Sequence, residues 1–206
     1  RNFDQYVTDL ESIRAGFDLR PDRTVLLGHS MGALIGLRHA LHYPHRFQGM
    51  VLTSPLLRIK VPISIPLFVM GRVLSTVAPR FRFASRVKPE EITRHPEFVA
   101  SRKEDPLCHR SVTAKWFFAM RDAVEDIWKT PERIDIPLLV LQAGLEHLVD
   151  PQAPEEWLSL TRSTDREVHL FPEHFHELLN ELDWEQIAHL VADWIATRLP
   201  ERGRIP

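Results

Sequence analysis

A pentapeptide with glycine at both ends, Gly28-His29-Ser30-Met31-Gly32, constrains the fold of this chain more than any other feature. The apolar run before it, residues 24–27, predicts a buried strand of the parallel type. The residues after it, 33–41, have the apolar spacing of a helix. A serine in this pattern, between a strand and a helix, lies on a sharp turn that exposes its hydroxyl. The glycines remove side chains that would collide at the turn. We therefore expect Ser30 to be a nucleophile.

Strand-like apolar runs alternate with helical segments along the rest of the chain. This order predicts a parallel β-sheet flanked by helices, which is the α/β class. A chain of 206 residues has the usual length of one such domain. The expected strands cover residues 24–27, 49–55, 136–142 and 167–171, and the expected helices cover residues 4–17, 33–43 and 176–198.

The stretch from residue 56 to residue 131 has no clear strand and is too long for a simple crossover between strands. It is apolar and basic at first and helical later. We predict that residues 56–131 form a helical cap above the carboxyl edge of the sheet. Residues 1–55 and 132–206 then form the core of the fold.

Candidate partners of a serine nucleophile follow the third and fourth expected strands. Such a serine needs a base to take its proton and an acid to orient that base. His176 follows the fourth strand and is the candidate base, with His174 and His169 as alternatives. Glu146 follows the third strand and is the candidate acid. Asp150 is the alternative acid, although an aspartate at that position also fits a helix N-cap.

The two neighbours of Ser30 also have expected roles. The backbone N–H of Met31, at the start of the helix, is placed to bind the oxyanion that forms on a carbonyl under attack. His29 supports the turn and is a candidate substrate contact. No spacing of His, Cys, Asp or Glu fits a metal site, and this chemistry requires no metal or organic cofactor.

Composition excludes several classes of protein. The formal net charge of −2 gives no reason to expect nucleic acid as a partner. The single cysteine, Cys108, excludes an internal disulfide and fits a reducing compartment, so we predict a cytoplasmic protein. The longest apolar stretch, residues 61–74, contains two prolines and an arginine and is too short to cross a membrane.

The chain begins with Arg1, and the serine turn follows after about two dozen residues. A doubly wound sheet usually has several strands before such a turn. We therefore expect this sequence to be an N-terminally truncated piece of a longer protein, with its first strands missing. The remaining sheet would then have an unpaired edge and an exposed apolar face.

Four segments of the chain carry a resemblance to a known family. They are Gly28-His29-Ser30-Met31-Gly32, Met50-Val51-Leu52-Thr53-Ser54-Pro55, Glu104-Asp105-Pro106-Leu107 and His176-Glu177-Leu178-Leu179-Asn180-Glu181. Taken together, they resemble the monoacylglycerol lipase and lysophospholipase branch of the α/β-hydrolases, which is serine aminopeptidase S33-like. By this resemblance Ser30 is the nucleophile and His176 the base. The family usually has Asp where Glu146 stands and Gly where Ala33 stands.

The resemblance also implies a part that this chain lacks. In the family, a His-Gly loop before the first long helix supplies the second N–H of the oxyanion hole. Loss of one such donor costs on the order of 10²- to 10³-fold in rate. We therefore expect the parent protein to be active and this chain alone to be poorly active.

The resemblance implies hydrolysis of a carboxylic ester of monoacylglycerol or lysophospholipid through an acyl-enzyme. The alternatives are another serine hydrolase, such as an aminopeptidase or acyltransferase, and an inactive homologue used for binding. Ile65, Phe68 and Val69 are candidate substrate contacts within an apolar run dense enough to line an acyl tunnel. With the basic residues around it, this run is also a candidate for peripheral contact with a membrane. The sequence leaves the oligomeric state open.

Overall fold

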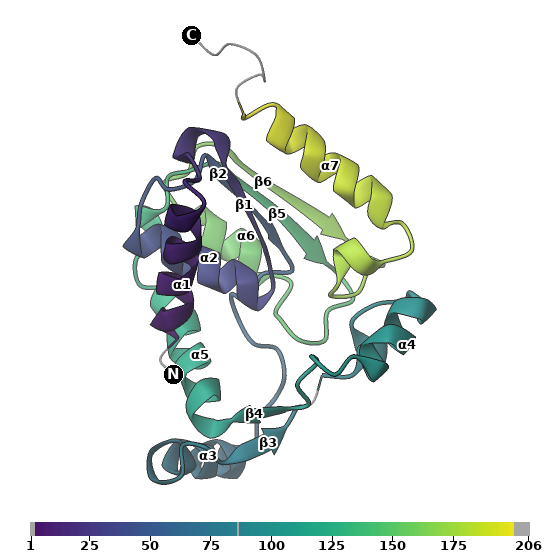
Figure 1. Ribbon diagram of the computed structural model, residues 1–206. Coiled ribbons are helices and arrows are strands. Elements are labelled where there is room, and N and C mark those ends of the chain that lie inside the picture. The colour runs from purple at the N-terminus through teal and green to yellow at the C-terminus, as the bar shows by residue number, and fades with distance from the viewer. Residues whose placement is uncertain (1–2, 86, 200–206) are drawn as a thin grey trace.

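The computed structural model describes residues 3–85 and 87–199 and has a four-stranded parallel sheet at its centre (Figure 1). The strand order is β1-β2-β5-β6, and every neighbouring pair is parallel. The predicted α/β class is confirmed. The strands are β1 (Val25–His29), β2 (Gly49–Thr53), β5 (Leu138–Ala143) and β6 (Arg166–Phe171).

The central strands β2 and β5 are buried along their whole length, which fits their nearly continuous apolar sequences. β1 lies at one edge of the described sheet, and 42% of the surface of Leu27 on this strand is exposed. β6 lies at the other edge, where Val168 and Leu170 are also exposed.

Helices cover both faces of the sheet (Figure 1). On one face, α2 (Met31–His42), α5 (Ala114–Ile127) and α6 (Ala153–Ser159) share the larger apolar core with the sheet. α1 (Asp4–Gly16) packs on α2. On the other face, α7 (Trp184–Ala196) buries Ile187, Val191 and Trp194 against the sheet in a second core.

The last helix begins at Trp184 rather than at residue 176, which corrects the prediction. Residues 174–177 form a loop, and a short 3-10 turn over Leu178–Asn180 follows it. The loop is held by contacts with distant parts of the chain. The N–H of Phe175 donates to Glu181, and the N–H of Glu177 donates to the carbonyl of Ile92.

Residues 56–131 contain more than helices. A short antiparallel pair joins β3 (Arg82–Ala84) and β4 (Ser111–Thr113), so the expectation of a segment without strands was wrong. α3 (Ile65–Val77) and α4 (Pro96–Glu104) are the other elements before α5. Figure 1 shows α3, β3 and β4 on the side of the sheet where the strands end. The division into core and cap at residues 56 and 131 stays a prediction, because α5 packs into the larger core.

A partly buried polar cluster joins α1 to α2. Glu11 accepts hydrogen bonds from Arg14 at 2.7 and 3.0 Å and contacts the fully buried His39 at 2.8 Å. The bond from Arg14 is the main reason why the pKa of Glu11 is lowered from 4.5 to about 2, and His39 lowers it further against the effect of burial. The charged form of Glu11 therefore stabilises the folded state.

The first prediction concerns the acid stability of this cluster. A folded pKa below the unfolded one means that the stabilisation is complete above pH 4.5 and is lost as the pH falls through about 2. We expect Glu11→Gln to lower the free energy of unfolding by on the order of 2–3 kcal/mol at pH 7 and by roughly half as much at pH 3. Urea unfolding of both proteins at the two pH values measures this. An equal difference at both would contradict the assignment.

Candidate active site

Ser30 lies on the turn between β1 and α2 in a strained conformation, with φ 49° and ψ −112°. The backbone around it fixes this turn. The N–H of Ser30 donates to the carbonyl of Thr53 at 2.9 Å, and its carbonyl accepts from the N–H of Leu56 at 3.1 Å. A Cβ added to Gly28 would lie 2.8 Å from the backbone of Ala33, so only glycine permits this approach.

Gly32 differs from the expectation that both glycines prevent a collision. A Cβ added there would meet nothing within 4 Å. The close approach at this turn is made by the strand residue Gly28 against the first turn of α2, and Gly32 already lies inside that helix. The steric requirement therefore falls on Gly28 alone.

Glu146 and His176 form a hydrogen-bonded pair that is nearly free of solvent exposure. Oε1 of Glu146 binds Nδ1 of His176. The other carboxylate oxygen, Oε2, accepts from the N–H groups of Leu148 at 3.2 Å and Val149 at 2.9 Å. Both oxygens have partners, so the carboxylate is fixed in orientation toward the imidazole.

Two contacts beyond the predicted residues hold this pair. The hydroxyl of Ser54 donates to the carbonyl of His176 at 2.8 Å, and Nζ of Lys60 donates to the carbonyl of Glu146 at 2.8 Å. Neither residue was predicted from the sequence to belong to the site. Ser54 directly follows β2, at the sheet edge where the other candidates lie, and that position was the available signal. Lys60 had no such signal.

Asp150 does not contact His176 within the described residues. Its carboxylate binds Nη1 of Arg58 at 2.8 Å and accepts from the N–H of Gln152 at 3.0 Å. Burial alone would raise the pKa of Asp150, but the bonds from Arg58 and Gln152 hold it below its ordinary value. The structure therefore places Glu146, and not Asp150, beside the candidate base.

His29 packs beside His176, with the ring centroids 4.8 Å apart in an edge-to-face arrangement. Its Nδ1 lies 3.0 Å from the hydroxyl of Thr53. Burial lowers the pKa of His29, although Glu177 opposes this effect. The His29 ring thus contacts both Thr53 and His176, but it lines neither of the two pockets near this site.

The alternative bases have other partners. His174 binds the carboxylate of Asp183 at 2.8 and 2.9 Å, and His169 lies on β6 near Glu167 at 3.5 Å. In the part of the chain that the structure describes, no group of three or more His, Cys, Asp or Glu side chains could hold a metal ion. Between described residues, no hydrogen bond joins the Ser30 hydroxyl to His176, whose side chain is bound to Glu146.

A cavity of about 350 Å³ begins at Ser30 and Met31 and extends under the cap. Among the described residues, no charged side chain lines it, and Ser30 and Ser85 are the lining residues with hydroxyl groups. Its walls include large apolar side chains from α3, β3 and α5, namely Leu67, Phe68, Phe83, Trp116, Phe117 and Phe118. The cavity can therefore hold an extended apolar group whose end lies at Ser30.

Of the three predicted substrate contacts in the cap, Phe68 lines this cavity but Ile65 and Val69 do not. Ile65 and Val69 lie one turn apart on α3 and are 79% and 54% exposed. Leu67, Phe68 and Gly71 form the inner face of the helix instead. The expectation for Ile65 and Val69 is corrected, because helical periodicity turns them away from the residues that face the cavity.

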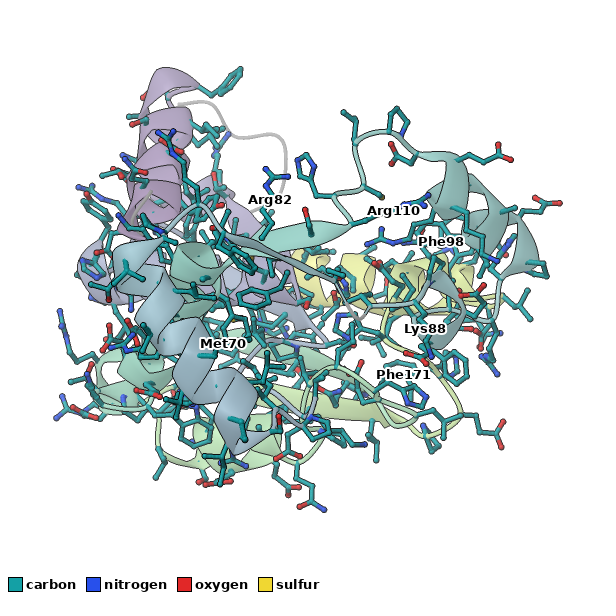
Figure 2. All side chains as sticks on the ribbon, turned by 90° about the horizontal axis from the view of Figure 1, so that it is seen from below. Met70, Arg82, Lys88, Phe98, Arg110 and Phe171 are labelled. Atoms are coloured by element: carbon teal, nitrogen blue, oxygen red, sulfur yellow. The ribbon has the colours of Figure 1, made fainter. Side chains whose placement is uncertain are left out.

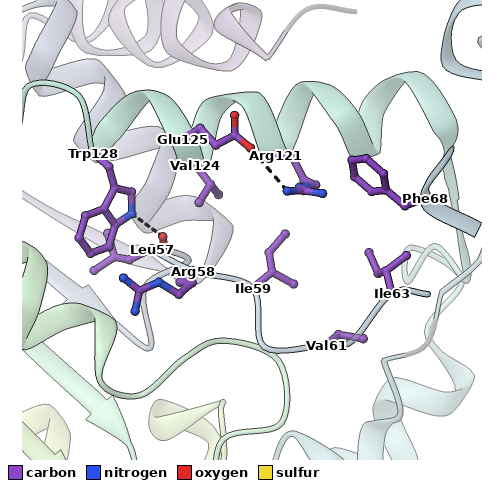
Figure 3. A pocket seen from close by; sticks show the side chains of 10 residues that line it. All are labelled: Leu57, Arg58, Ile59, Val61, Ile63, Phe68, Arg121, Val124, Glu125 and Trp128. Atoms are coloured by element: carbon purple, nitrogen blue, oxygen red, sulfur yellow. Dashed lines mark hydrogen bonds and ion pairs between the residues drawn. The ribbon is translucent and has the colours of Figure 1, made fainter. Parts of the chain in front are cut away.

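A second pocket, of about 530 Å³, lies between residues 57–63 and helix α5 (Figure 3). It shares Ile59, Val61, Ile63 and Phe68 with the cavity but does not reach Ser30. Its remaining lining includes charged side chains, and Arg121 lies 4.7 Å from the ring centroid of Phe68. The apolar cavity, not this larger pocket, belongs to the site around Ser30.

The fold and the strained serine turn define an α/β-hydrolase. The family model described as Hydrolase_4, serine aminopeptidase S33, matches residues 1–183, and the chain belongs to this family. The predicted resemblance is confirmed.

Relatives and solved structures agree with this assignment. The chain is 27% identical over 192 residues to phospholipase YtpA of Bacillus subtilis, covering 91% of this chain and 73% of that protein. It is 28% identical over 182 residues to rat monoglyceride lipase, covering 86% of this chain and 60% of the relative. The crystal structure of Paleococcus ferrophilus monoacylglycerol lipase has a TM-score of 0.87 at 24% identity, over 96% of this chain and 76% of that one.

Proposed function

We propose that this chain carries the acyl-transfer site of a serine hydrolase that cleaves carboxylic esters of lipids, with monoacylglycerol or lysophospholipid as substrate. The observation that supports it most is the cavity that begins at Ser30, whose described lining residues are almost all apolar. An acyl chain in this cavity would place its ester carbonyl at the serine. The names of the relatives, a phospholipase and monoglyceride lipases, point to the same substrates.

The proposed reaction has two halves. His176 takes the proton of Ser30 as the serine oxygen attacks the ester carbonyl, and the N–H of Met31 stabilises the oxyanion. The tetrahedral intermediate collapses, His176 protonates the leaving alcohol, and the acyl group remains on Ser30. Water then attacks this acyl-enzyme with His176 as base, which releases the fatty acid. Glu146 holds the imidazole in the required tautomer throughout.

The alternatives receive less support from the cap. An aminopeptidase needs an acidic side chain to hold the substrate amine. Glu90, Glu91 and Glu97 are the cap residues that could provide it. Glu90 pairs with Lys103, Glu91 pairs with Lys88, and none of the three glutamates lines the cavity. The intact Glu146–His176 pair also disfavours an inactive homologue.

Chain-length preference tests the proposed substrate. The protein, with whatever natural sequence flanks residues 1–206, is assayed on p-nitrophenyl butanoate, octanoate and dodecanoate and on a monoacylglycerol. Turnover that favours the longer esters and the glyceride supports the lipid ester hydrolase. Turnover of the butanoate alone would restrict the activity to small esters, and no ester turnover would overturn the proposal.

The second prediction fills the cavity from the inner face of α3. A side chain added at Gly71 would meet Phe118, whose ring lies 3.3 Å from the position of a new Cβ. We expect Gly71→Leu to reduce kcat/KM for the dodecanoate ester by about 10- to 100-fold, because the added side chain occupies space that the acyl chain needs. The butanoate ester should change by less than about threefold.

Val73→Leu is the matched control, since Val73 lies on α3 and is 55% exposed. Its chain-length profile should equal that of the wild type. Equal losses on all esters in Gly71→Leu would mean that the cavity does not hold the acyl chain.

We further infer that the outer face of α3 contacts a membrane surface. Along α3, Ile65, Val69, Val73 and Val77 recur every four residues and are each more than half exposed. No acidic residue occurs between residues 57 and 89, whereas seven basic ones do. Figure 2 looks onto the cap from below, with Met70, Arg82 and Lys88 labelled. Apolar side chains with basic residues around them suit an anionic lipid surface.

Such contact would be peripheral. None of the described helices is both long and apolar enough to cross a bilayer. The cytoplasmic location stays a prediction.

The third prediction tests membrane contact directly. We expect the double substitution Val69→Glu and Val73→Glu to reduce binding to phosphatidylglycerol vesicles by at least about tenfold, because it removes apolar contact and adds negative charge. Vesicle co-sedimentation measures the bound fraction. Val168→Glu with Leu170→Glu is the control, since both side chains are exposed on the edge strand β6. Equal loss in both variants would contradict a specific role of α3.

A further inference from the structure

A short cap segment, residues 92–94, contacts the loop that carries His176. The carbonyl of Ile92 accepts from the N–H of Glu177 at 2.8 Å. The hydroxyl of Thr93 donates to the carbonyl of Asn180 at 2.7 Å. Arg94 completes the contact through Glu181. The two partners of each contact are more than 80 positions apart in the sequence, so the contacts form only in the folded chain.

Glu181 is the centre of this contact and has no solvent exposure. Its Oε2 binds Nε of Arg94 at 2.7 Å, and its Oε1 accepts from the N–H of Arg94 at 3.2 Å. Oε1 also accepts from the N–H of Phe175 at 3.1 Å. A buried carboxylate is costly unless it is paired, and here a cation and two N–H groups satisfy it. The proposed reaction gives this charged pair no role.

The contacts hold the peptide groups on both sides of the candidate base. The residue before His176, Phe175, is bound by Glu181, and the residue after it, Glu177, is bound by Ile92. The carbonyl of His176 itself accepts from Ser54. With these backbone positions fixed, the imidazole has little freedom except rotation of its own side chain.

We propose that Arg94 and Glu181 are positioning residues for His176, through which the cap holds the proton-transfer histidine against Glu146. Neither residue touches the reacting atoms. This proposal rests on the proposed function, since positioning matters only if His176 transfers protons. A misplacement of about 1 Å at a catalytic group is enough to cost on the order of 10²-fold in rate.

The test uses variants on both sides of the contact. Glu181→Ala removes the carboxylate, and Arg94→Met removes its cation from the cap side. Each is expected to reduce kcat on an ester by between about 10- and 100-fold and to change KM by less than about threefold. Glu181→Gln keeps an oxygen for the N–H of Phe175 and should recover most of kcat.

Arg198→Met is the matched control. Arg198 makes a similar two-bond pair with Asp165, at 2.8 and 2.6 Å, between the end of α7 and the start of β6. Loss of the Arg198–Asp165 pair should lower stability without changing kcat per folded molecule. Active-site titration with a fluorophosphonate counts the folded molecules for this comparison.

A second readout does not depend on turnover. The Nδ1–H of His176 bound to Glu146 should give a downfield proton NMR resonance, which Glu181→Ala and Arg94→Met should weaken or shift and Arg198→Met should not. If the wild type shows no Ser30-dependent turnover, the proposed function fails while this resonance still tests the positioning. Unchanged kcat and an unchanged resonance in folded Glu181→Ala or Arg94→Met would overturn the positioning proposal.

Discussion

Ser30→Ala is expected to lower kcat/KM for a long-chain ester by at least about 10⁴-fold. The substitution removes the oxygen that forms the acyl-enzyme, whereas the cavity, the oxyanion-binding N–H and the Glu146–His176 pair remain. Any residual turnover would come from binding and oxyanion stabilisation alone. The measurements are hydrolysis of the p-nitrophenyl dodecanoate ester and covalent labelling by a fluorophosphonate probe, which mass spectrometry detects.

Ser30→Gly separates the chemistry of this position from its conformation. Ser30 has a positive φ of 49°, a region that costs most residues on the order of 1–3 kcal/mol and costs glycine little. We expect Ser30→Gly to be as inactive as Ser30→Ala but to unfold at a higher temperature. Ser30→Ala keeps the strain and should unfold close to the wild type.

The two variants also define the results that would contradict this assignment. Turnover or probe labelling that survives in folded Ser30→Ala would show that another residue is the nucleophile. A Ser30→Gly protein less stable than Ser30→Ala would show that the turn carries no strain at this position.

The parts of this site that the sequence predicted depend on local patterns. Ser30 lies on a turn whose strand, glycines and helix are all within about twenty residues, so each signal supports the others. His176 and Glu146 follow strands that end at the same sheet edge, and parallel topology then brings them together. Local pattern and topology were therefore enough to name Ser30 on the strained turn and the Glu146–His176 pair as the candidate site.

The parts that could not be predicted depend on contacts between distant residues. The contact of Arg94 with Glu181 joins positions 87 apart and leaves no periodic signal in either segment. The pairing of β3 with β4 joins three-residue strands, too short for a recognisable alternation. On α3 both faces are apolar, so the sequence could not show that Phe68 faces inward and Val69 outward.

Glu146→Gln is expected to lower kcat by about 10³- to 10⁴-fold, although the two side chains have nearly the same shape. The reason lies in the second carboxylate oxygen. Oε2 accepts from the N–H groups of Leu148 and Val149, so a glutamine must turn its carbonyl oxygen to these donors. Its amide NH₂ then faces Nδ1 of His176 and donates to it. The imidazole is left with its proton on Nε2, where it cannot accept the proton of Ser30.

Asp150→Asn is the matched control for this prediction. Asp150 binds Arg58 and the N–H of Gln152, and asparagine keeps an oxygen for the latter. We expect kcat to stay within about threefold and stability to fall slightly, as for a half-exposed ion pair.

Glu146→Asp tests whether a side chain one methylene shorter still contacts Nδ1 of His176, since the family usually has aspartate here. The shorter side chain should lose contact with Nδ1 unless the loop moves, and we expect an intermediate loss of about 10- to 100-fold.

Steady-state kinetics of the three variants on the dodecanoate ester decide between the two carboxylates. If Asp150→Asn lost as much activity as Glu146→Gln, the working acid would be Asp150 and the loop would have to rearrange when substrate binds. Activity of Glu146→Gln within tenfold of the wild type would mean that the tautomer of His176 is set by another group. The expected order of kcat, from highest to lowest, is Asp150→Asn, Glu146→Asp and Glu146→Gln, because only Glu146 shares a hydrogen bond with the imidazole.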